Sequence, residues 1–163
     1  MTKSEFKATT KQWLYSKGFQ TMKNEKSIYP MEGFDLFVLF YKSRFDEVFY
    51  FDLGFELNGM EPPRGIGQIR AEIPNKKYWQ YVTMADGSKH VGIESFVYED
   101  WNKEDYLECL EKIYALYIQP YFDLGFELLK IIAKDPTCGG KFGASKKRQY
   151  YIHPNTVKVI LSK

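Results

Sequence analysis

The sequence predicts an α+β fold, in which an N-terminal helix precedes an antiparallel β-meander of about four to six strands and two C-terminal helices pack on one face of the sheet. Residues 48–57 alternate between apolar and other side chains, as a strand with one buried face does. Helix-start signatures at Thr2 and Asn102 are each followed by apolar residues at helical spacing. Aromatic residues make up 18% of the chain, and they favour pleated, half-buried surfaces.

The first element expected is a helix at residues 3–17. Thr2 and Glu5 have the spacing of a capping box, in which each side chain binds a free backbone N–H group of the first turn. Apolar side chains recur at helical spacing as far as Trp13. Gly18 can adopt the left-handed conformation that closes a helix.

The meander should follow this helix. One strand is apolar on both faces except at Asp35, which is typical of a strand in the middle of a sheet. The next strand places Phe49 and four further apolar side chains on a single face, so it should cover a core on one side only. The polar stretch at residues 42–47 is the expected connection between the two. The four expected strands are residues 27–29, 34–41, 48–57 and 67–73.

A further hairpin is expected beyond the meander. Residues 78–84 and 90–98 are strand-like and flank the sequence Ala-Asp-Gly-Ser. An Asp-Gly pair favours a tight turn because both residues tolerate a positive φ angle. The pattern therefore predicts that these two runs pair with each other.

The C-terminal part should be mainly helical. Asn102 resembles a helix cap, and a long apolar stripe follows it. Pro120 cannot donate a backbone hydrogen bond, so it should either kink this helix or open a second one that runs through residues 131–132. The glycines at 139–140 mark the expected end of that helix, and residues 156–161 are expected to form a last strand.

One heptapeptide, Phe-Asp-Leu-Gly-Phe-Glu-Leu, occurs twice, at residues 51–57 and at residues 122–128. A duplication would carry its flanking residues along, and the flanks of the two copies do not match. We therefore expect a coincidence, with the first copy in a strand and the second in a helix.

The length of 163 residues predicts a single domain, residues 1–163. Cys109 and Cys138 are the two cysteines of the chain, so a secreted cystine framework is not supported, and Cys109 is expected to be packed in a helix and not reactive. The N-terminal residues lack the apolar core of a signal peptide, and no stretch approaches the length of a membrane span. A cytoplasmic protein without membrane contact is expected.

Charge is unevenly distributed along the chain, although the net charge is only +2. Residues 94–135 carry ten acidic and four basic groups, whereas residues 136–163 carry six basic groups and no acidic group. The basic C-terminal segment could attract a charged partner, or it could face the acidic region within the fold.

Cofactor and metal sites are not indicated. The glycines around Lys141 do not form a phosphate-binding loop, because Asp135 and Phe142 stand where that motif needs a glycine and a serine or threonine. His90 and His153 are far apart and have no second ligand at metal-binding spacing. We therefore expect no cofactor and no transition-metal site.

A possible site lies on the outer face of the predicted sheet. Asp52 and Glu56 share one face of their strand, about 13 Å apart, which is too far for a catalytic carboxylate pair. Arg70 or Glu72 could complete a site from an adjacent strand. The alternative interpretation is a solvated outer face of the sheet.

The C-terminal segment suggests a second possible site, for nucleic acid. It interleaves basic side chains that could bind phosphates with aromatic side chains that could stack on bases. The alternative is a solvated basic loop followed by an edge strand. The candidate nucleic-acid-binding residues are Lys141, Lys146, Lys147, Arg148, Tyr150 and Tyr151.

A family resemblance rests on three segments, Leu14-Tyr15-Ser16-Lys17-Gly18-Phe19, Phe37-Val38-Leu39-Phe40 and Phe51-Asp52-Leu53-Gly54-Phe55-Glu56-Leu57. With them the chain resembles the bacterial family known as domain of unknown function 4304, mainly over residues 1–60. The resemblance implies an α+β fold, in which a helix closed by Gly-Phe precedes an antiparallel sheet and C-terminal helices pack behind it. It implies no catalytic residues, so no site is transferred.

The function expected from the sequence is that of a non-enzymatic accessory module, of the kind that bacterial immunity proteins represent, which binds a protein partner. The alternative is a nucleic-acid-binding protein that uses the basic C-terminal segment. A catalytic function has less support, because no nucleophile, metal or phosphate motif is found in the sequence.

Overall fold

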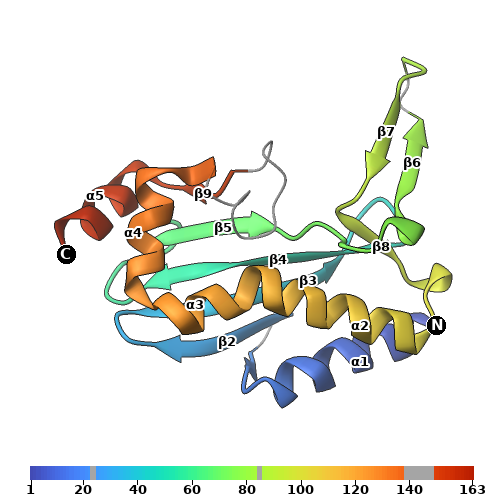
Figure 1. The fold of residues 1–163 in the computed structure, drawn as a ribbon, viewed down its shortest axis with the longest axis horizontal. Coiled ribbons are helices and arrows are strands. Elements are labelled where there is room, and N and C mark those ends of the chain that lie inside the picture. The colour runs from blue at the N-terminus through green and yellow to red at the C-terminus, as the bar shows by residue number, and fades with distance from the viewer. Residues whose placement is uncertain (23–24, 84–85, 138–148) are drawn as a thin grey trace.

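The computed structural model describes residues 1–22, 25–83, 86–137 and 149–163. This part of the chain forms an antiparallel seven-stranded sheet with helices packed along one of its faces (Figure 1). The strand order is β1-β2-β3-β4-β5-β9, and β8 pairs with β4 beside this path. The predicted α+β class, with an N-terminal helix, a central meander and C-terminal helices, is confirmed.

Helix α1 (Lys3–Ser16) begins as the sequence predicts. The Thr2 side chain accepts a hydrogen bond from the backbone N–H of Glu5, and the Glu5 carboxylate accepts one from the backbone N–H of Thr2. The helix is followed by Gly18, whose φ angle of 88° lies in the left-handed region. Its buried side chains, Phe6 and Trp13 among them, face the sheet and α2.

The predicted meander is present in the predicted order, with each strand pairing with the next. Phe34 lies opposite Leu57 at one end of the β3–β4 ladder, and Lys42 lies opposite Phe49 at the other. Two short strands complete the edges, since β1 pairs with β2 and β9 pairs with β5. The strands are β1 (Gln20–Thr21), β2 (Lys26–Met31), β3 (Phe34–Lys42), β4 (Val48–Leu57), β5 (Ile66–Arg70), β8 (Ser95–Val97) and β9 (Tyr151–Ile152).

The predicted hairpin forms, but it is shorter than predicted and separate from the main sheet. β6 (Gln80–Thr83) pairs with β7 (Lys89–Gly92) in a two-stranded sheet that projects from the body of the molecule (Figure 1). Gly87 in the turn has a φ angle of 80°, as a tight turn requires. Two details of the prediction were wrong: Tyr78 ends a short 3₁₀ helix, and β8 leaves the hairpin to pair with β4.

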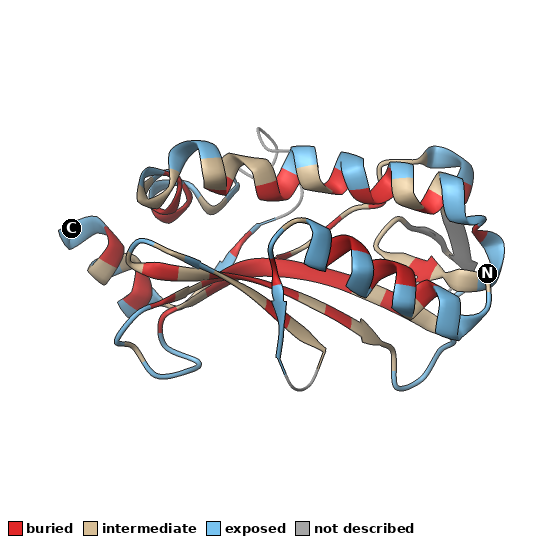
Figure 2. Ribbon diagram, turned by 90° about the horizontal axis from the view of Figure 1, so that it is seen from below, coloured by how far each residue is buried: buried red, intermediate tan, exposed pale blue. Residues whose placement is uncertain are grey.

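The acidic region forms a nearly continuous helical rod that covers one face of the sheet (Figure 2). It comprises α2 (Lys103–Ile113), a π-helical turn (Tyr114–Ile118), α3 (Gln119–Leu124) and α4 (Phe126–Lys134).

Pro120 stands in the first turn of α3, so the second predicted alternative, a new helix, is correct. The break between α3 and α4 was not predicted. It falls at Gly125, whose φ of 53° and ψ of −133° favour glycine. The second copy of the repeated heptapeptide is helical on both sides of this break, and the first copy lies in β4, as expected. The expected helix end at residues 139–140 lies outside the described residues, and α4 ends at Lys134.

The predicted last strand at residues 156–161 was wrong, because this segment is helix α5 (Pro154–Ser162). Pro154 occupies the first helical position, and the His153 side chain accepts a hydrogen bond from the backbone N–H of Asn155. Thr156 and Ile160, four residues apart, point into the protein on one face of this helix. The β-branched residues of this segment favour a strand, but Pro154, the His153 cap and the helical spacing of Thr156 and Ile160 stabilise a helix.

Aromatic side chains fill the core between the helices and the sheet. The Phe6 ring stacks on Tyr106 of α2 with 4.0 Å between centroids, and Phe40 stacks on Phe49 across the β3–β4 ladder at 5.0 Å. Buried residues run along the sheet side of the helices and along the centre of the strands (Figure 2). The high aromatic content of the sequence is therefore largely explained by this core.

A pair of substitutions in α5 tests whether the C-terminal segment is part of the core. Ile160 is fully buried, so Ile160→Ala should lower the free energy of unfolding by about 2–5 kcal/mol. The neighbouring Leu161 is 47% exposed, so Leu161→Ala should change it by no more than about 0.5 kcal/mol. Urea unfolding followed by circular dichroism measures both. Equal effects of the two substitutions would show that α5 does not pack as described.

Candidate binding face of the sheet

Within the described residues, α1, α2 and α3 all lie on one side of the main sheet (Figure 2), and the opposite side is called here the open face. The strand registers identify its residues, because side chains directly opposite each other point to the same side. The apolar row of β4 faces the helices, so the alternate residues of β4 and their cross-strand partners point the other way. The open face carries Lys26, Ile28, Pro30, Asp35, Phe37, Leu39, Tyr41, Tyr50, Asp52, Gly54, Glu56, Ile66, Gln68, Arg70 and Tyr151.

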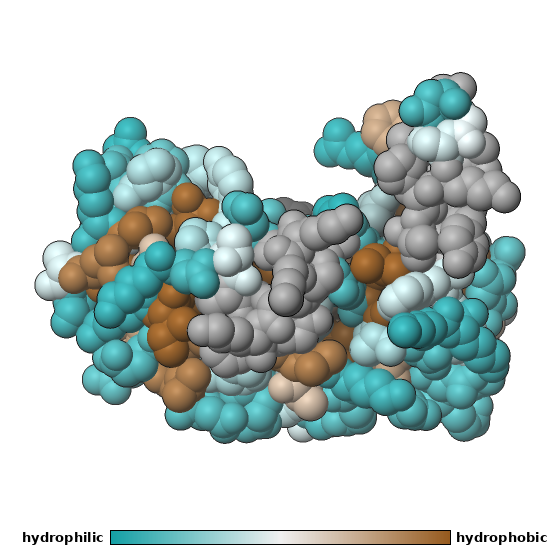
Figure 3. All heavy atoms as spheres, turned by 45° about the horizontal axis from the view of Figure 1, so that its top comes forward, coloured by the Kyte–Doolittle hydropathy of each residue, from teal (hydrophilic) through white to brown (hydrophobic). Residues whose placement is uncertain are grey.

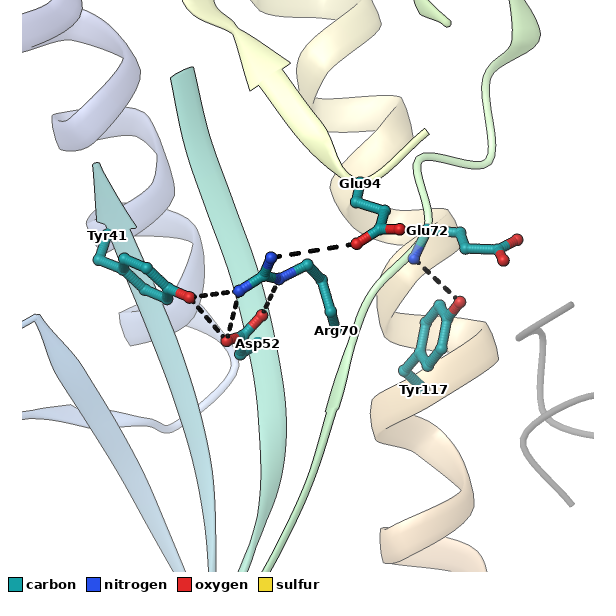
Figure 4. Close-up of polar contacts among 6 residues, drawn as sticks. All are labelled: Tyr41, Asp52, Arg70, Glu72, Glu94 and Tyr117. Atoms are coloured by element: carbon teal, nitrogen blue, oxygen red, sulfur yellow. Dashed lines mark hydrogen bonds and ion pairs between the residues drawn. The ribbon is translucent and has the colours of Figure 1, made fainter. Parts of the chain in front are cut away.

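A polar cluster on this face joins three strands (Figure 4). Arg70 Nε donates a hydrogen bond to Asp52 Oδ1 at 2.7 Å, and Arg70 Nη2 donates one to the Tyr41 hydroxyl at 2.5 Å. The Tyr41 hydroxyl in turn donates to Asp52 Oδ2 at 2.9 Å. The three side chains therefore hold one another in a closed ring of hydrogen bonds.

Two further residues surround the guanidinium group of Arg70. Its Cζ lies 4.1 Å from the centroid of the Tyr50 ring, a cation–π contact, and Glu94 Oε2 lies 4.0 Å from Nη1. Asp52 is nearly fully buried, with 7% of its side chain exposed, whereas 32% of the Arg70 side chain is exposed. The cluster thus presents a cation and aromatic edges at the surface and keeps its central carboxylate inside.

Burial and neighbouring charges shift the pKa values of Arg70 and Tyr41 in this cluster. Burial opposes the charged form of Arg70, but the hydrogen bond and the charge of Asp52 outweigh it, so the pKa of Arg70 is raised. Burial, followed by the charge of Asp52 and its hydrogen bond, raises the pKa of Tyr41 above its usual value. Both pKa shifts favour the forms found at neutral pH, a charged Arg70 and a protonated Tyr41 hydroxyl.

The other end of the open face has a different arrangement. Lys26 Nζ forms an ion pair with Glu56 Oε2 at 2.6 Å and lies 5.0 Å from the centroid of the Phe37 ring between them. Phe37 is only 2% exposed, although none of the described helices covers it. Opposite Phe37 is Gly54, where an added Cβ would lie 2.0 Å from the carbonyl oxygen of Gly67, so the strands leave no room for a larger residue.

The residues predicted for a sheet-surface site are only partly brought together. Asp52 and Arg70 are directly opposite each other and form an ion pair, whereas Glu56 pairs with Lys26 at the other end of the face. The alternative prediction of a solvated outer face was wrong at Asp52, because its carboxylate is buried by the groups that bind it.

Sequence reasoning missed Tyr41, Tyr50 and Lys26. The alternation of β3 and β4 contains a signal for the first two, since both fall on the side opposite to the apolar row, but their partners depend on the register.

The predicted nucleic-acid site is only partly described. Lys141, Lys146, Lys147 and Arg148 lie outside the described residues. Tyr150 is buried and its hydroxyl lies 3.1 Å from that of Tyr121, so its expected role in stacking on a base was wrong. Tyr151 is 71% exposed and lies on the open face, opposite Gln68. Of the two aromatic residues in this candidate site, only Tyr151 remains available to a ligand.

Other chemistry-bearing groups in the described residues are few. Burial raises the pKa of the Cys109 thiol to about 12, as expected for a packed and unreactive cysteine. No group of three or more His, Cys, Asp and Glu side chains in the described ranges is placed to hold a metal ion. None of the helices described combines the length and the hydropathy that a membrane span requires.

An apolar patch lies over α4 and α5 (Figure 3), where Ile131 and Leu161 are partly exposed. Beside it, a groove of about 540 Å³ runs between the β2–β3 turn and the break at Gly125, and Lys163 lines one side of it. No polar side chain of a described residue is buried without a hydrogen-bond partner, so nothing in this region indicates a specific ligand.

Comparisons with protein-family models, with curated proteins and with solved structures find no match to this chain. The resemblance to domain of unknown function 4304 therefore stays a prediction. Any functional conclusion must come from the geometry of the open face and from its charges.

The Asp52–Arg70–Tyr41 cluster should be a measurable source of stability. Asp52→Asn removes the charge that Arg70 requires, so it should lower the free energy of unfolding by about 1–3 kcal/mol. Asp35→Asn, on the same face, should change it by no more than about 0.5 kcal/mol, because Asp35 forms no hydrogen bond or ion pair in the part of the chain that the structure describes. Chemical unfolding measures both. If Asp52→Asn left the free energy of unfolding unchanged, that result would contradict the hydrogen-bonded ring.

The raised pKa of Cys109 predicts slow alkylation. At about pH 8.5 an ordinary thiol is half ionised, whereas Cys109 should stay protonated and inaccessible. Iodoacetamide should therefore leave the Cys109 peptide unmodified in the native protein and modify it in concentrated guanidinium chloride. Mass spectrometry of the digested protein measures both states. Equal alkylation in the two would contradict the packing of α2.

Proposed function

We propose that this chain is a non-enzymatic accessory module, comparable in role to an immunity protein, that binds a protein partner through the open face. The observation that carries the proposal is the Arg70 cluster, a cation held in a fixed orientation on a sheet face that no described helix covers. Apolar residues flank the cluster and the Lys26–Glu56 pair, as in the centre of many interfaces.

Arg and Tyr are among the residues that contribute most to binding energy in protein interfaces. On the open face Arg70, Tyr41 and Tyr50 are fixed by contacts within the chain, so a partner would lose little side-chain entropy on binding them. The half-buried Ile28 and Leu39 add apolar area next to them. These features support a binding surface in which the polar groups are organised before the partner arrives.

A binding role is favoured over a catalytic one by how the polar groups are used. Asp52 accepts hydrogen bonds from two side chains and is buried, so it is poorly placed to accept a proton from a substrate. Glu56 is bound to Lys26, and the Cys109 thiol is protonated and buried. Asp52 and Glu56 are therefore each held by a cation, and none of these three groups is placed to act on a substrate.

Nucleic-acid binding is the second candidate, and the exposed Tyr151 supports it. This residue lies on the open face, directly after the basic segment that contains Lys146 and Lys147. The charges of the open face oppose this alternative, because the carboxylates on it would repel phosphates.

The same proposal includes a cytoplasmic location in a bacterium and a relationship to domain of unknown function 4304. What supports it is sequence alone, namely a pair of cysteines too few for a cystine framework and the three segments quoted above.

Affinity purification from the native host tests the proposal. The tagged full chain should recover one stoichiometric protein that survives nuclease treatment. Tyr50→Ala removes an aromatic surface of the open face, and Gln68→Trp adds bulk to it, so both should reduce recovery at least about tenfold. Tyr15→Ala is the matched control, because Tyr15 is 79% exposed on α1 and far from the open face.

Circular dichroism must show that each variant is folded. Recovery that is lost on nuclease treatment, or that Tyr15→Ala reduces as much as the open-face variants do, would contradict the proposal. Recovered nucleic acid that depends on Tyr151 would favour the second candidate.

A further inference from the structure

The described charges on and beside the open face fall into two groups, one around Lys26 and one around Arg70. In the first group, Asp35 of β3 lies directly opposite Glu56 of β4. Like charges in directly opposite positions of a sheet oppose pairing of the strands. Lys26 binds Glu56 at 2.6 Å, whereas Asp35 forms no hydrogen bond or ion pair with any of the described residues.

The second group lies at the other end of the same face. Arg70 binds Asp52 at 2.7 Å and has Glu94 4.0 Å away on its other side (Figure 4). Arg70 therefore has a described carboxylate on each side. The described charged side chains of the two groups therefore give the open face an excess of negative charge.

Apolar and aromatic surface connects the two groups. Ile28 lies opposite Phe37 and Lys26 opposite Leu39, and the leucine and isoleucine side chains are half-buried. Such surface suits the aliphatic part of a lysine or arginine, which packs on apolar groups while its charged end reaches a carboxylate.

We propose that the partner of the open face presents a basic segment, and that one of its lysine or arginine side chains binds between Asp35 and Glu56. This inference rests on the proposed function, since it names the chemistry of the partner that docks on the same face. The incoming cation would give Asp35 its missing partner and relieve the repulsion between the two carboxylates.

The charge also decides between classes of partner. A basic protein surface is attracted from a distance by the excess of carboxylates, so association should be faster at low salt. An acidic surface, or a phosphate backbone, would meet Asp35 and Glu94 with like charge. The open face should therefore select against both.

Selection of peptides on the immobilised full chain tests this inference without knowledge of the natural partner. The probe is a random dodecapeptide library displayed on phage, eluted after washing at low salt. Peptides rich in lysine and arginine should be enriched, and they should bind Asp35→Asn at least about tenfold more weakly. Glu108→Asn, which removes an exposed carboxylate from α2, is the matched control and should bind them as the original chain does.

Peptides that are lost with Tyr50→Ala and are basic, salt-sensitive and dependent on Asp35 would support the inference. Peptides that are lost with Tyr50→Ala but are acidic or uncharged would overturn it and leave the proposed function standing. If Tyr50→Ala and Gln68→Trp bind every selected peptide as the original chain does, the proposed function fails as well.

Discussion

The whole arrangement depends on the alternation of side chains along β4. This strand pairs with β3, β5 and β8, and its row of apolar side chains from Phe49 to Leu57 packs under the helices. Because successive side chains point to opposite faces, a strand that buries one row must expose the other or cover it locally. The helices that cover the first row leave the second to the polar and aromatic groups of the open face.

Much of the fold could be predicted because the signals were local. The capping box of α1, the asparagine cap of α2 and the alternation of β4 each depend on a few neighbouring residues. The errors arose where local preference and tertiary packing disagree. Valine and isoleucine in α5 favour a strand, but Pro154 and the burial of Ile160 fix a helix. The break at Gly125 lies in a heptapeptide that forms a strand elsewhere, so its sequence alone could not show the break.

The candidate site was less predictable than the fold for a physical reason. Sequence alternation indicates which residues share a face, and it identified Asp52 and Arg70 as candidate site residues. It does not indicate the register, which decides that Arg70 lies opposite Asp52 and that Lys26 reaches Glu56 across Phe37. Tyr41 joined the cluster only because the β3–β4 register places it beside Tyr50 and diagonal to Asp52. A site formed by cross-strand neighbours requires the structure for its identification.

The two kinds of group on the open face would contribute differently to binding. An excess carboxylate at a partly exposed position costs the free chain little, because water screens its repulsion from neighbours. When a partner excludes that water, the same repulsion becomes stronger, and it then penalises any partner without a cation. The fixed Arg70–Tyr50 contact does not require a cation from the partner. The charge of Arg70 is already bound by Asp52, and the Tyr50 ring can pack against many side chains. On this view the aromatic cluster supplies contact area, while the Asp35–Glu56 pair determines which partners are accepted.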